Sequence, residues 1–332
     1  MVSVFNLGDF ELASGVTLAD AQLTYEVHGK LNGARDNAVV FATWYAGRHK
    51  EVAGFVREGR ALDPAKYFIV VPNTFGNGLS TSPSNAKAPH DGTHFPLVSA
   101  YDNVAAQHRL LTDGLGVRGV ALVAGYSMSA QQAFHWGALH SGFVRRIAAI
   151  CGSAKTSPHN WLFLEGLKTA LQADPAWQTG GSAGIRAFTT VYAGWLASQT
   201  FYREGLHLKK MAGPLPSISV YLDLLTSLFG SFDPRDLMAL LATWQDADVS
   251  AHPKFSNDVR KALGSITARA VVMPCSTDLY FPPEDSKAAV ALMPNATLLP
   301  IPSVWGHLAG HPALNPEDAA FVNRALEELL SS

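Results

Sequence analysis

Residues 119–140 read GVALVAGYSMSAQQAFHWGALH and are the most informative segment of the chain. A short apolar run enters a Gly-Tyr-Ser-Met-Ser turn, and a pattern with helical spacing follows at once. This is the strand–turn–helix context in which a G-x-S-x-G motif holds a serine hydroxyl above the edge of a sheet. Gly125 supplies the small residue needed before Ser127, whereas Ser129 makes the motif degenerate. We predict Ser127 as a nucleophile; a serine that only caps the helix is the structural alternative.

Short apolar runs alternate with helical patterns along most of the chain. Because parallel sheets are covered by helices on both faces, this alternation predicts an α/β fold with a mostly parallel sheet. This alternation stops between residues 155 and 259, where helical spacing dominates and no strand is expected. The predicted helices there are Trp161–Ala173, Ile185–Leu196, Ile218–Leu228 and Asp236–Trp244. We therefore predict a core domain of residues 1–154 and 260–332 with an inserted helical lid at 155–259. The predicted buried strands, besides residues 119–125, are Ala38–Trp44, Tyr67–Asn73, Ile147–Gly152, Ala268–Cys275 and Ala296–Pro302. Thr17–Tyr25 is predicted as a strand or hairpin arm at the sheet edge.

Composition excludes several classes of protein. The chain has 332 residues, of which 48% are hydrophobic and 16% charged, so it can bury a large core. The 25 basic and 27 acidic residues give a net charge of −2, which offers no basic field for nucleic acid or a membrane surface. The start lacks a signal-peptide pattern, and no apolar run is long enough to span a membrane. With only two cysteines, a cytoplasmic location is expected.

A serine nucleophile needs a base and an acid that orients the base, and in this fold they follow in the order Ser, Asp or Glu, His. Asp278 comes just after the predicted strand that ends at Cys275, and His307 lies in the loop after the next strand. Asp285 is a weaker candidate because it follows two prolines at a helix start. His311 competes with His307, but Pro312 follows it directly. We predict Ser127, Asp278 and His307 as the catalytic residues.

Two backbone N–H groups are expected to stabilise the oxyanion: that of Met128, at the start of the helix, and that of Trp44, in the loop after the strand at 38–44. Aromatic residues near the turn and in the lid are expected to contact substrate, namely Tyr45, Tyr126, Trp161 and Trp195.

No cofactor or metal is predicted. Gly76-Asn77-Gly78 lacks the remainder of a phosphate-binding fingerprint and is interpreted as a tight turn. His307 and His311 have a spacing found in zinc-binding helices, but the neighbouring Gly310 and Pro312 disfavour a helix and no third ligand is evident. Cys151 and Cys275 are predicted to be buried thiols at strand ends.

The chain resembles the homoserine O-acetyltransferase branch of the α/β-hydrolase family, which includes acyltransferases and related ester hydrolases. The resemblance implies an α/β-hydrolase fold, an acyl-enzyme formed on Ser127, a helical lid and a homodimer formed through lid helices. Together with the Asp278 and His307 segments, the matching stretches span nearly the whole chain: LTYEVHGKLN (23–32), VVPNTFGNGLSTSPSN (70–85), AGYSMSAQQAFHWG (124–137), ALQADPAWQTGG (170–181) and GIRAFTTVYAGW (184–195).

Departures from the transferase pattern favour hydrolysis. The transferases carry a Gln-Arg pair on the first lid helix and an aspartate after the catalytic histidine, where this chain has Leu167, Lys168 and Leu308. An acceptor with a carboxylate and an ammonium needs paired charges, and Arg binds a carboxylate in a bidentate way that Lys cannot. The predicted function is therefore a serine-dependent carboxylic ester hydrolase acting on small acyl esters. The alternative is an O-acyltransferase that moves an acyl group from acyl-CoA to a hydroxylated acceptor; a non-catalytic binding protein is a third, less favoured class.

Overall fold

The computed structural model describes residues 2–210 and 213–331 and is built on one large sheet. The sheet has eight strands in the order β1-β2-β4-β3-β5-β6-β9-β10, antiparallel at β1–β2 and β2–β4 and parallel elsewhere. Its strands are β1 (Val2–Glu11), β2 (Thr17–His28), β3 (Ala38–Phe41), β4 (Phe68–Pro72), β5 (Val120–Tyr126), β6 (Arg146–Ile150), β9 (Arg269–Met273) and β10 (Ala296–Leu298). The predicted mostly parallel sheet is confirmed. The stretch at 17–25 is β2, and its partner β1 was not predicted.

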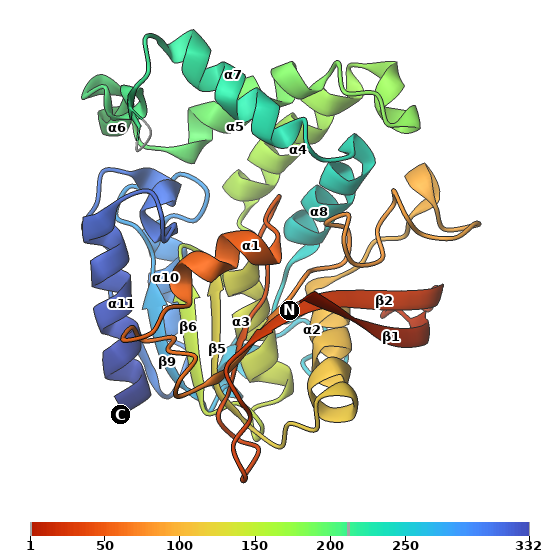
Figure 1. Ribbon diagram of the computed structural model, residues 1–332, viewed down its shortest axis with the longest axis vertical. Coiled ribbons are helices and arrows are strands. Elements are labelled where there is room, and N and C mark those ends of the chain that lie inside the picture. Colours follow the sequence, from red (N-terminus) through yellow and green to blue (C-terminus); the bar gives the residue numbers. More distant parts are fainter. Residues whose placement is uncertain (1, 211–212, 332) are drawn as a thin grey trace.

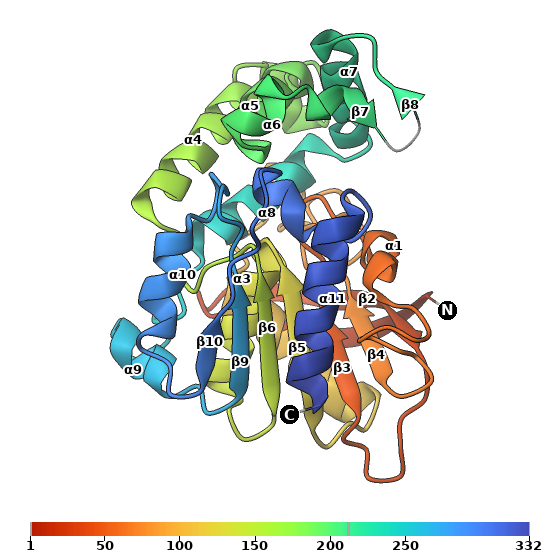
Figure 2. The ribbon, with the colours of Figure 1, turned by 90° about the vertical axis from the view of Figure 1, so that its left-hand side faces the viewer.

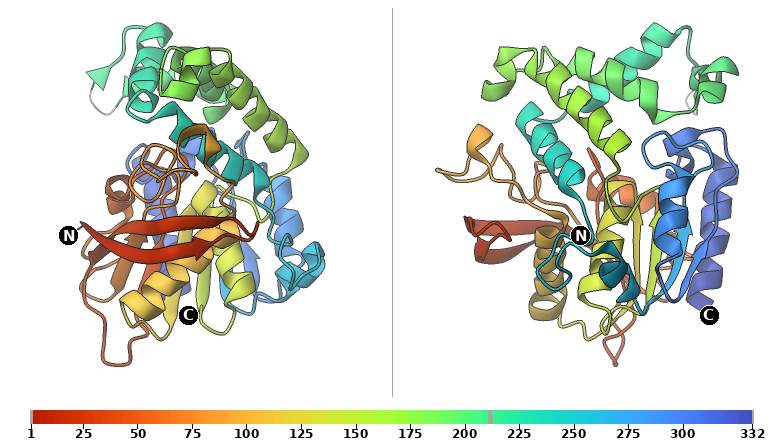
Figure 3. Two further views of the ribbon diagram at one scale, coloured as in Figure 1. Left: turned by 90° about the vertical axis from the view of Figure 1, so that its right-hand side faces the viewer. Right: turned by 180° about the vertical axis from the view of Figure 1, so that it is seen from behind.

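The parallel strands are apolar throughout because both faces of the sheet are covered. Successive side chains of a strand point to opposite faces, so Val40 packs into one core layer and Val39 and Phe41 into the other. One layer is completed by α2 (Ala100–Arg109), α3 (Met128–Leu139), α9 (Val259–Gly264) and α10 (Pro283–Val290), and the other by α1 (His49–Val52) and α11 (Pro316–Ser331). Figures 2 and 3 show α11 on one side of the sheet and α2 and α3 on the other.

The chain leaves the sheet after β6 and returns to the neighbouring strand β9. Between them lie α4 (Pro158–Gln172), α5 (Ile185–Leu196), α6 (Gln199–Arg203), α7 (Ile218–Phe229) and α8 (Pro234–Asp246). Figure 1 shows α4, α5 and α7 stacked above the sheet, over the edge where the parallel strands end. We call residues 155–259 the lid segment. Its predicted helices agree with the observed ones, but the expectation that it holds no strand is wrong: β7 (Lys209–Lys210) pairs with β8 (Gly213–Pro214).

The lid segment has an apolar core of its own, which reaches down to the edge of the sheet. Phe163, Leu167 and Phe188 from the lid pack in one cluster with Met128 at the start of α3 and Tyr280 from the loop after β9. These contacts fix where the lid sits above Ser127. In the described part of the chain, no helix combines the length and apolar character required to cross a bilayer.

Candidate active site

Ser127 sits on a strained turn between β5 and α3. Its backbone has φ 61° and ψ −130°, a conformation that L residues rarely adopt and that costs free energy unless the surroundings enforce it. The surroundings are tight: a Cβ atom on Gly125 would lie 2.2 Å from the carbonyl oxygen of Ser129, and one on Gly152 would lie 2.7 Å from that of Ser127. The glycine before the serine is thus required by close approach of strand and helix.

The degenerate position of the motif is accommodated by hydrogen bonding. The Ser129 hydroxyl donates to the carbonyl oxygen of Tyr126 at 2.8 Å and accepts from the N–H of the same residue at 2.9 Å. The side chain therefore folds back onto the end of β5 and satisfies its own polar atoms there. Serine replaces glycine at this position without opening the turn.

The three residues predicted to be catalytic meet at the carboxyl edge of the sheet. Nε2 of His307 lies 2.8 Å from Oγ of Ser127, and Nδ1 of His307 lies 2.8 Å from Oδ2 of Asp278. All three side chains are buried. They follow three strands, β5, β9 and β10, whose carboxyl ends share one edge of the sheet, which is why residues 180 positions apart come into contact.

Asp278 and His307 are each held by further contacts. Oδ1 of Asp278 accepts hydrogen bonds from the N–H groups of Tyr280 at 2.8 Å and Phe281 at 3.1 Å, which leaves Oδ2 for the imidazole. The His307 ring packs between Tyr126, at 5.0 Å between centroids, and Tyr280, at 4.7 Å. The Tyr126 hydroxyl also donates to the carbonyl oxygen of His307 at 3.0 Å. Orientation of the imidazole is therefore fixed from two sides.

The structure also shows where Asp285, the alternative acid, and the predicted oxyanion donors Met128 and Trp44 lie. Asp285 lies in the first turn of α10, and the acid that contacts His307 is Asp278. In the described residues, the N–H groups of Met128 and Trp44 donate to no protein acceptor, and both residues flank the Ser127 turn.

The loop that carries Trp44 is fixed by a buried polar network. The Thr43 hydroxyl accepts from the N–H of Thr74 at 2.9 Å, and the Thr43 carbonyl accepts from the Thr74 hydroxyl at 2.9 Å. The Asn77 amide donates to the carbonyl oxygen of Gly47 at 3.3 Å. The predicted tight turn at 76–78 is confirmed by positive φ at both glycines, and it supports the loop beside the site.

A cavity of about 420 Å³ opens onto Ser127 and His307. It lies between the sheet-edge loops, which contribute Trp44, Tyr45 and Tyr126, and the lid segment, whose contributions include Tyr192 and Phe229. Tyr45 lies within 6.5 Å, between ring centroids, of an aromatic group formed by Phe188, Tyr192, Phe229 and Trp244. Of the predicted substrate contacts, Tyr45 and Tyr126 line the cavity.

Trp161 and Trp195 are not among the residues that line this cavity, so the structure gives no support to their prediction as substrate contacts. Trp161 is 47% exposed on α4, because Phe163 points inward and a residue two positions away on a helix lies nearly opposite. Trp195 packs instead on His159 and Phe163, at 4.7 and 5.0 Å between centroids.

Sequence reasoning missed Tyr192 and Phe229, which line the cavity, whereas Leu308 and His311, which also line it, were considered there for other roles. Tyr192 could have been found from its spacing of four residues from Phe188, which places both on one buried face of α5. The cavity position of Phe229 depends on how α7 packs, and no sequence pattern gives it.

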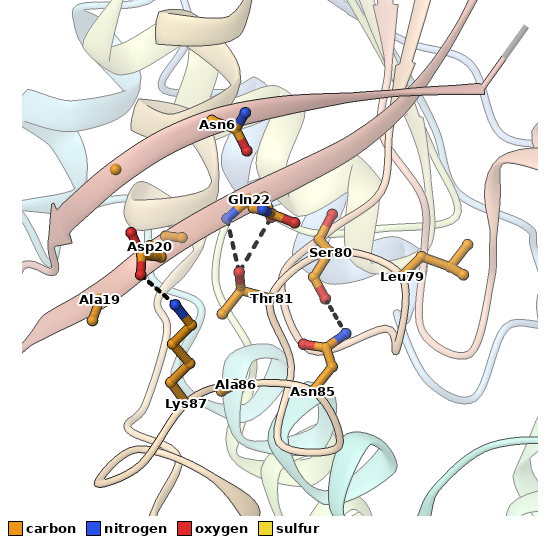
Figure 4. A pocket seen from close by; sticks show the side chains of 12 residues that line it. Asn6, Ala19, Asp20, Gln22, Leu79, Ser80, Thr81, Asn85, Ala86 and Lys87 are labelled. Carbon is orange, nitrogen blue, oxygen red and sulfur yellow. Dashed lines mark hydrogen bonds and ion pairs between the residues drawn. The ribbon is translucent and has the colours of Figure 1, made fainter.

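Outside this cavity, the described residues show no second pairing of a nucleophile with a base. A hollow of about 500 Å³ lies beneath the β1–β2 hairpin, and Figure 4 shows Asp20 paired with Lys87 and Gln22 bonded to Thr81 along its wall, with no nucleophile and base in contact. Burial raises the pKa of the Cys275 thiol to about 11 and holds that of Cys151 well above its ordinary value, which makes both poor nucleophiles. Among the described residues, no cluster of three or more His, Cys, Asp or Glu side chains could hold a metal ion.

Comparison with protein families identifies the class of protein. Residues 39–309 match the family described as alpha/beta hydrolase fold. The match spans well over half of the 332 residues, and the chain therefore belongs to the α/β-hydrolase family. The predicted fold and family resemblance are confirmed.

Individual relatives include both esterases and transferases. The chain is 38% identical over 343 residues to ethyl acetate hydrolase of Pseudomonas veronii, covering 99% of this chain and 95% of the relative. It superimposes on the solved structure of the acetyl esterase MekB with a TM-score of 0.95 and 37% identity, covering 100% and 97% of the two chains. Homoserine O-acetyltransferase of Chlorobium chlorochromatii is 29% identical over 311 residues, covering 88% and 86%. The esterases share more of this chain's residues than the transferase, which confirms the predicted esterase class.

Proposed function

We propose that this protein is a serine carboxylic ester hydrolase that acts on small acyl esters through an acyl-enzyme. The observation that carries the proposal is the continuous chain of hydrogen bonds from Ser127 through His307 to Asp278. His307 takes the proton of Ser127 as its oxygen attacks the ester carbonyl, and then gives that proton to the departing alcohol. Asp278 holds the proton on Nδ1 and stabilises the imidazolium. Water then attacks the acyl-enzyme by the same route.

The oxyanion of each tetrahedral intermediate is assigned to the N–H groups of Met128 and Trp44. Both donors lack a protein acceptor in the described residues, and the Met128 donor also lies at the N-terminus of α3, where the helix dipole favours negative charge. Removal of one such donor typically costs about 3 kcal/mol of transition-state stabilisation.

A small acyl group is favoured by the wall of the cavity. Trp44 is followed by Tyr45, whose ring joins the aromatic group of Phe188, Tyr192 and Phe229. These large rings limit the room for an acyl chain beside the oxyanion donors. In keeping with this, the esterases described above are named for ethyl acetate hydrolysis and for acetyl esterase activity.

Water is proposed as the acyl acceptor because the chain lacks charged groups for an amino-acid acceptor where the transferases have them. Leu167 is buried in the lid core, and the Lys168 ammonium donates to the Gln245 side chain. Leu308 presents an apolar side chain to the cavity directly after His307. None of these three residues offers the bidentate charge that a carboxylate acceptor requires.

A labelling experiment tests the proposal. The wild-type chain is expected to react with a fluorophosphonate probe at a single serine, and Ser127→Ala to abolish both labelling and hydrolysis of p-nitrophenyl acetate. Ser265→Ala, at the end of α9 beside the opposite edge of the sheet, is the matched control and is expected to label normally. Labelling that survives Ser127→Ala contradicts the proposal.

A second assay separates hydrolysis from transfer. Acetate release from acetyl esters is followed with and without homoserine, and acetyl-CoA is tested as the acyl donor. Free acid is expected as the main product in every case, with rates that fall as the p-nitrophenyl acyl chain lengthens. Transfer to homoserine that outruns hydrolysis by an order of magnitude would favour the acyltransferase alternative.

The lid segment, residues 155–259, is proposed as a separate inserted unit and as the contact between two copies of the chain. Support comes from apolar side chains left exposed on its outer helices: Leu162 is 65% exposed on α4, and Ile218 is 54% exposed on α7. Light scattering at several concentrations is expected to show a dimer that Ile218→Glu weakens. A wild-type chain that is monomeric throughout contradicts this part of the proposal.

A further inference from the structure

A second histidine, His311, faces the proposed active site without a role in the mechanism above. It follows the short helical segment Gly306–Gly310 that carries His307, and its side chain lines the same cavity. Its ring meets Trp44 and Tyr126 edge-on, with centroids 5.8 and 6.2 Å away and interplanar angles of 75° and 88°. Two aromatic rings therefore fix its orientation.

The hydrogen-bond pattern fixes which nitrogen of this ring carries the proton. The N–H of Ala313 lies 3.2 Å from Nδ1 of His311, and a backbone N–H only donates. Nδ1 must therefore be the acceptor, and the hydrogen of the neutral ring lies on Nε2. Burial, assisted by the nearby His307, lowers the pKa of His311 to about 4, so the ring is neutral at pH 7. Within the described residues, Nε2 has no hydrogen-bond partner, and it is not among the buried polar atoms that lack one, so it remains accessible.

We infer that the Nε2–H of His311 binds an oxygen atom in the alcohol part of the ester, and that the enzyme therefore favours acetate esters of alkoxy or hydroxy alcohols. This inference rests on the proposed function. The departing oxygen must lie beside Nε2 of His307, which protonates it. The Tyr126 ring stacks on the His307 ring and meets the His311 ring edge-on. Both imidazoles therefore pack against the same tyrosine at the cavity.

The chemistry of the His311 side chain supports this assignment. We place the acyl group against the aromatic group around Tyr45, Tyr192 and Phe229, in a cavity whose lining also includes Arg48, Glu51 and Lys209. His311 instead offers one neutral donor and no acceptor beyond the already occupied Nδ1. Such a group pairs with a neutral ether, hydroxyl or carbonyl oxygen, and it gains nothing from an alkyl chain.

A matched pair of esters tests the inference. 2-Methoxyethyl acetate and butyl acetate have the same number of chain atoms, and they differ by an ether oxygen in place of a methylene group. The measured quantity is the ratio of kcat/KM for the first ester to that for the second. Because both esters are hydrolysed by the same preparation, the ratio does not depend on the fraction of folded enzyme.

Loss of one neutral hydrogen bond corresponds to about a fivefold change in such a ratio. His311→Phe and His311→Ala are both expected to lower it by about fivefold, and His311→Gln, which keeps an N–H donor near the position of Nε2, to restore part of it. His94→Phe, at an exposed position in the segment Gly92–His94, is the control and is expected to keep the wild-type ratio.

The outcomes separate the two proposals. Wild-type enzyme that hydrolyses both esters in a Ser127-dependent way, with a ratio unchanged in His311→Phe and His311→Ala, overturns the inference and leaves the proposed function standing. A wild-type chain that hydrolyses neither ester nor p-nitrophenyl acetate overturns the proposed function, and the inference with it.

Discussion

Replacing Asp278 by asparagine should disable the base rather than merely weaken it. Oδ1 of Asp278 accepts from the N–H groups of Tyr280 and Phe281, at 2.8 and 3.1 Å. An asparagine keeps its oxygen against these donors, so its NH₂ group takes the place of Oδ2, 2.8 Å from Nδ1 of His307. That NH₂ donates to Nδ1 and forces the imidazole proton onto Nε2. The ring then cannot accept the proton of Ser127.

The expected loss is that of a triad whose histidine is held in the wrong tautomer, about 10⁴-fold in kcat. This equals about 5.4 kcal/mol of transition-state stabilisation at 25 °C. KM should change little, because Asp278 is buried behind His307 and does not line the cavity. The assay is steady-state hydrolysis of p-nitrophenyl acetate, with thermal unfolding recorded to show that the variant folds.

The control is Asp285→Asn, which makes the same chemical change at the nearby acid in the first turn of α10. It is expected to keep kcat close to that of wild type, because the acid that bonds to His307 is Asp278 and not Asp285. The reasoning is refuted if Asp278→Asn folds and retains kcat within tenfold of wild type, or if Asp285→Asn loses as much.

Three further predictions concern stability and pH. Gly125→Ala is expected to lower the free energy of unfolding in urea by about 2 kcal/mol or more, because its Cβ would lie 2.2 Å from the Ser129 carbonyl oxygen; an unchanged urea midpoint would show that the turn is not tightly packed. Tyr126→Phe removes the hydrogen bond to the His307 carbonyl and is expected to cost about 1 kcal/mol in the same assay, with a lower kcat; equal stability and kcat would mean that the bond is dispensable. Burial lowers the pKa of His140 from 6.5 to about 4. Between these two values His140 is protonated in the unfolded chain but neutral in the folded chain, so the free energy of unfolding falls as the pH drops from 6.5 to 4. Urea midpoints measured across that range should fall less steeply for His140→Phe, and parallel curves for the two proteins would contradict the assignment.

Local sequence was sufficient to predict the nucleophile turn and the order of its partners. The turn at Ser127 is a local structure, since a buried strand, a small residue and a helix start lie within a few positions of one another. α5 was likewise predicted with its observed bounds, Ile185–Leu196, because its apolar residues recur at helical spacing. Features of this kind depend on neighbours in the chain, and pattern reasoning finds them.

Other features depend on neighbours that are distant in the chain. The register of β1 against β2 involves a bulge near Gly8, and the weakly apolar β1 was not predicted as a strand. Trp161 was predicted to contact substrate from its residue type, but the rotation of α4 on the lid core places it outside the cavity. Helical periodicity shows which side chains share a face, and it does not show which face meets a binding site.

Residue patterns within short segments predict the class of fold, the turn at Ser127 and the order of the three candidate catalytic residues. The meeting of these segments with atoms 2.8 Å apart, the aromatic wall of the cavity and the position of His311 are seen only in the folded chain. Directional hydrogen bonds and close packing between distant segments depend on the crossing of strands and the rotation of helices. Those quantities are fixed by the whole core at once.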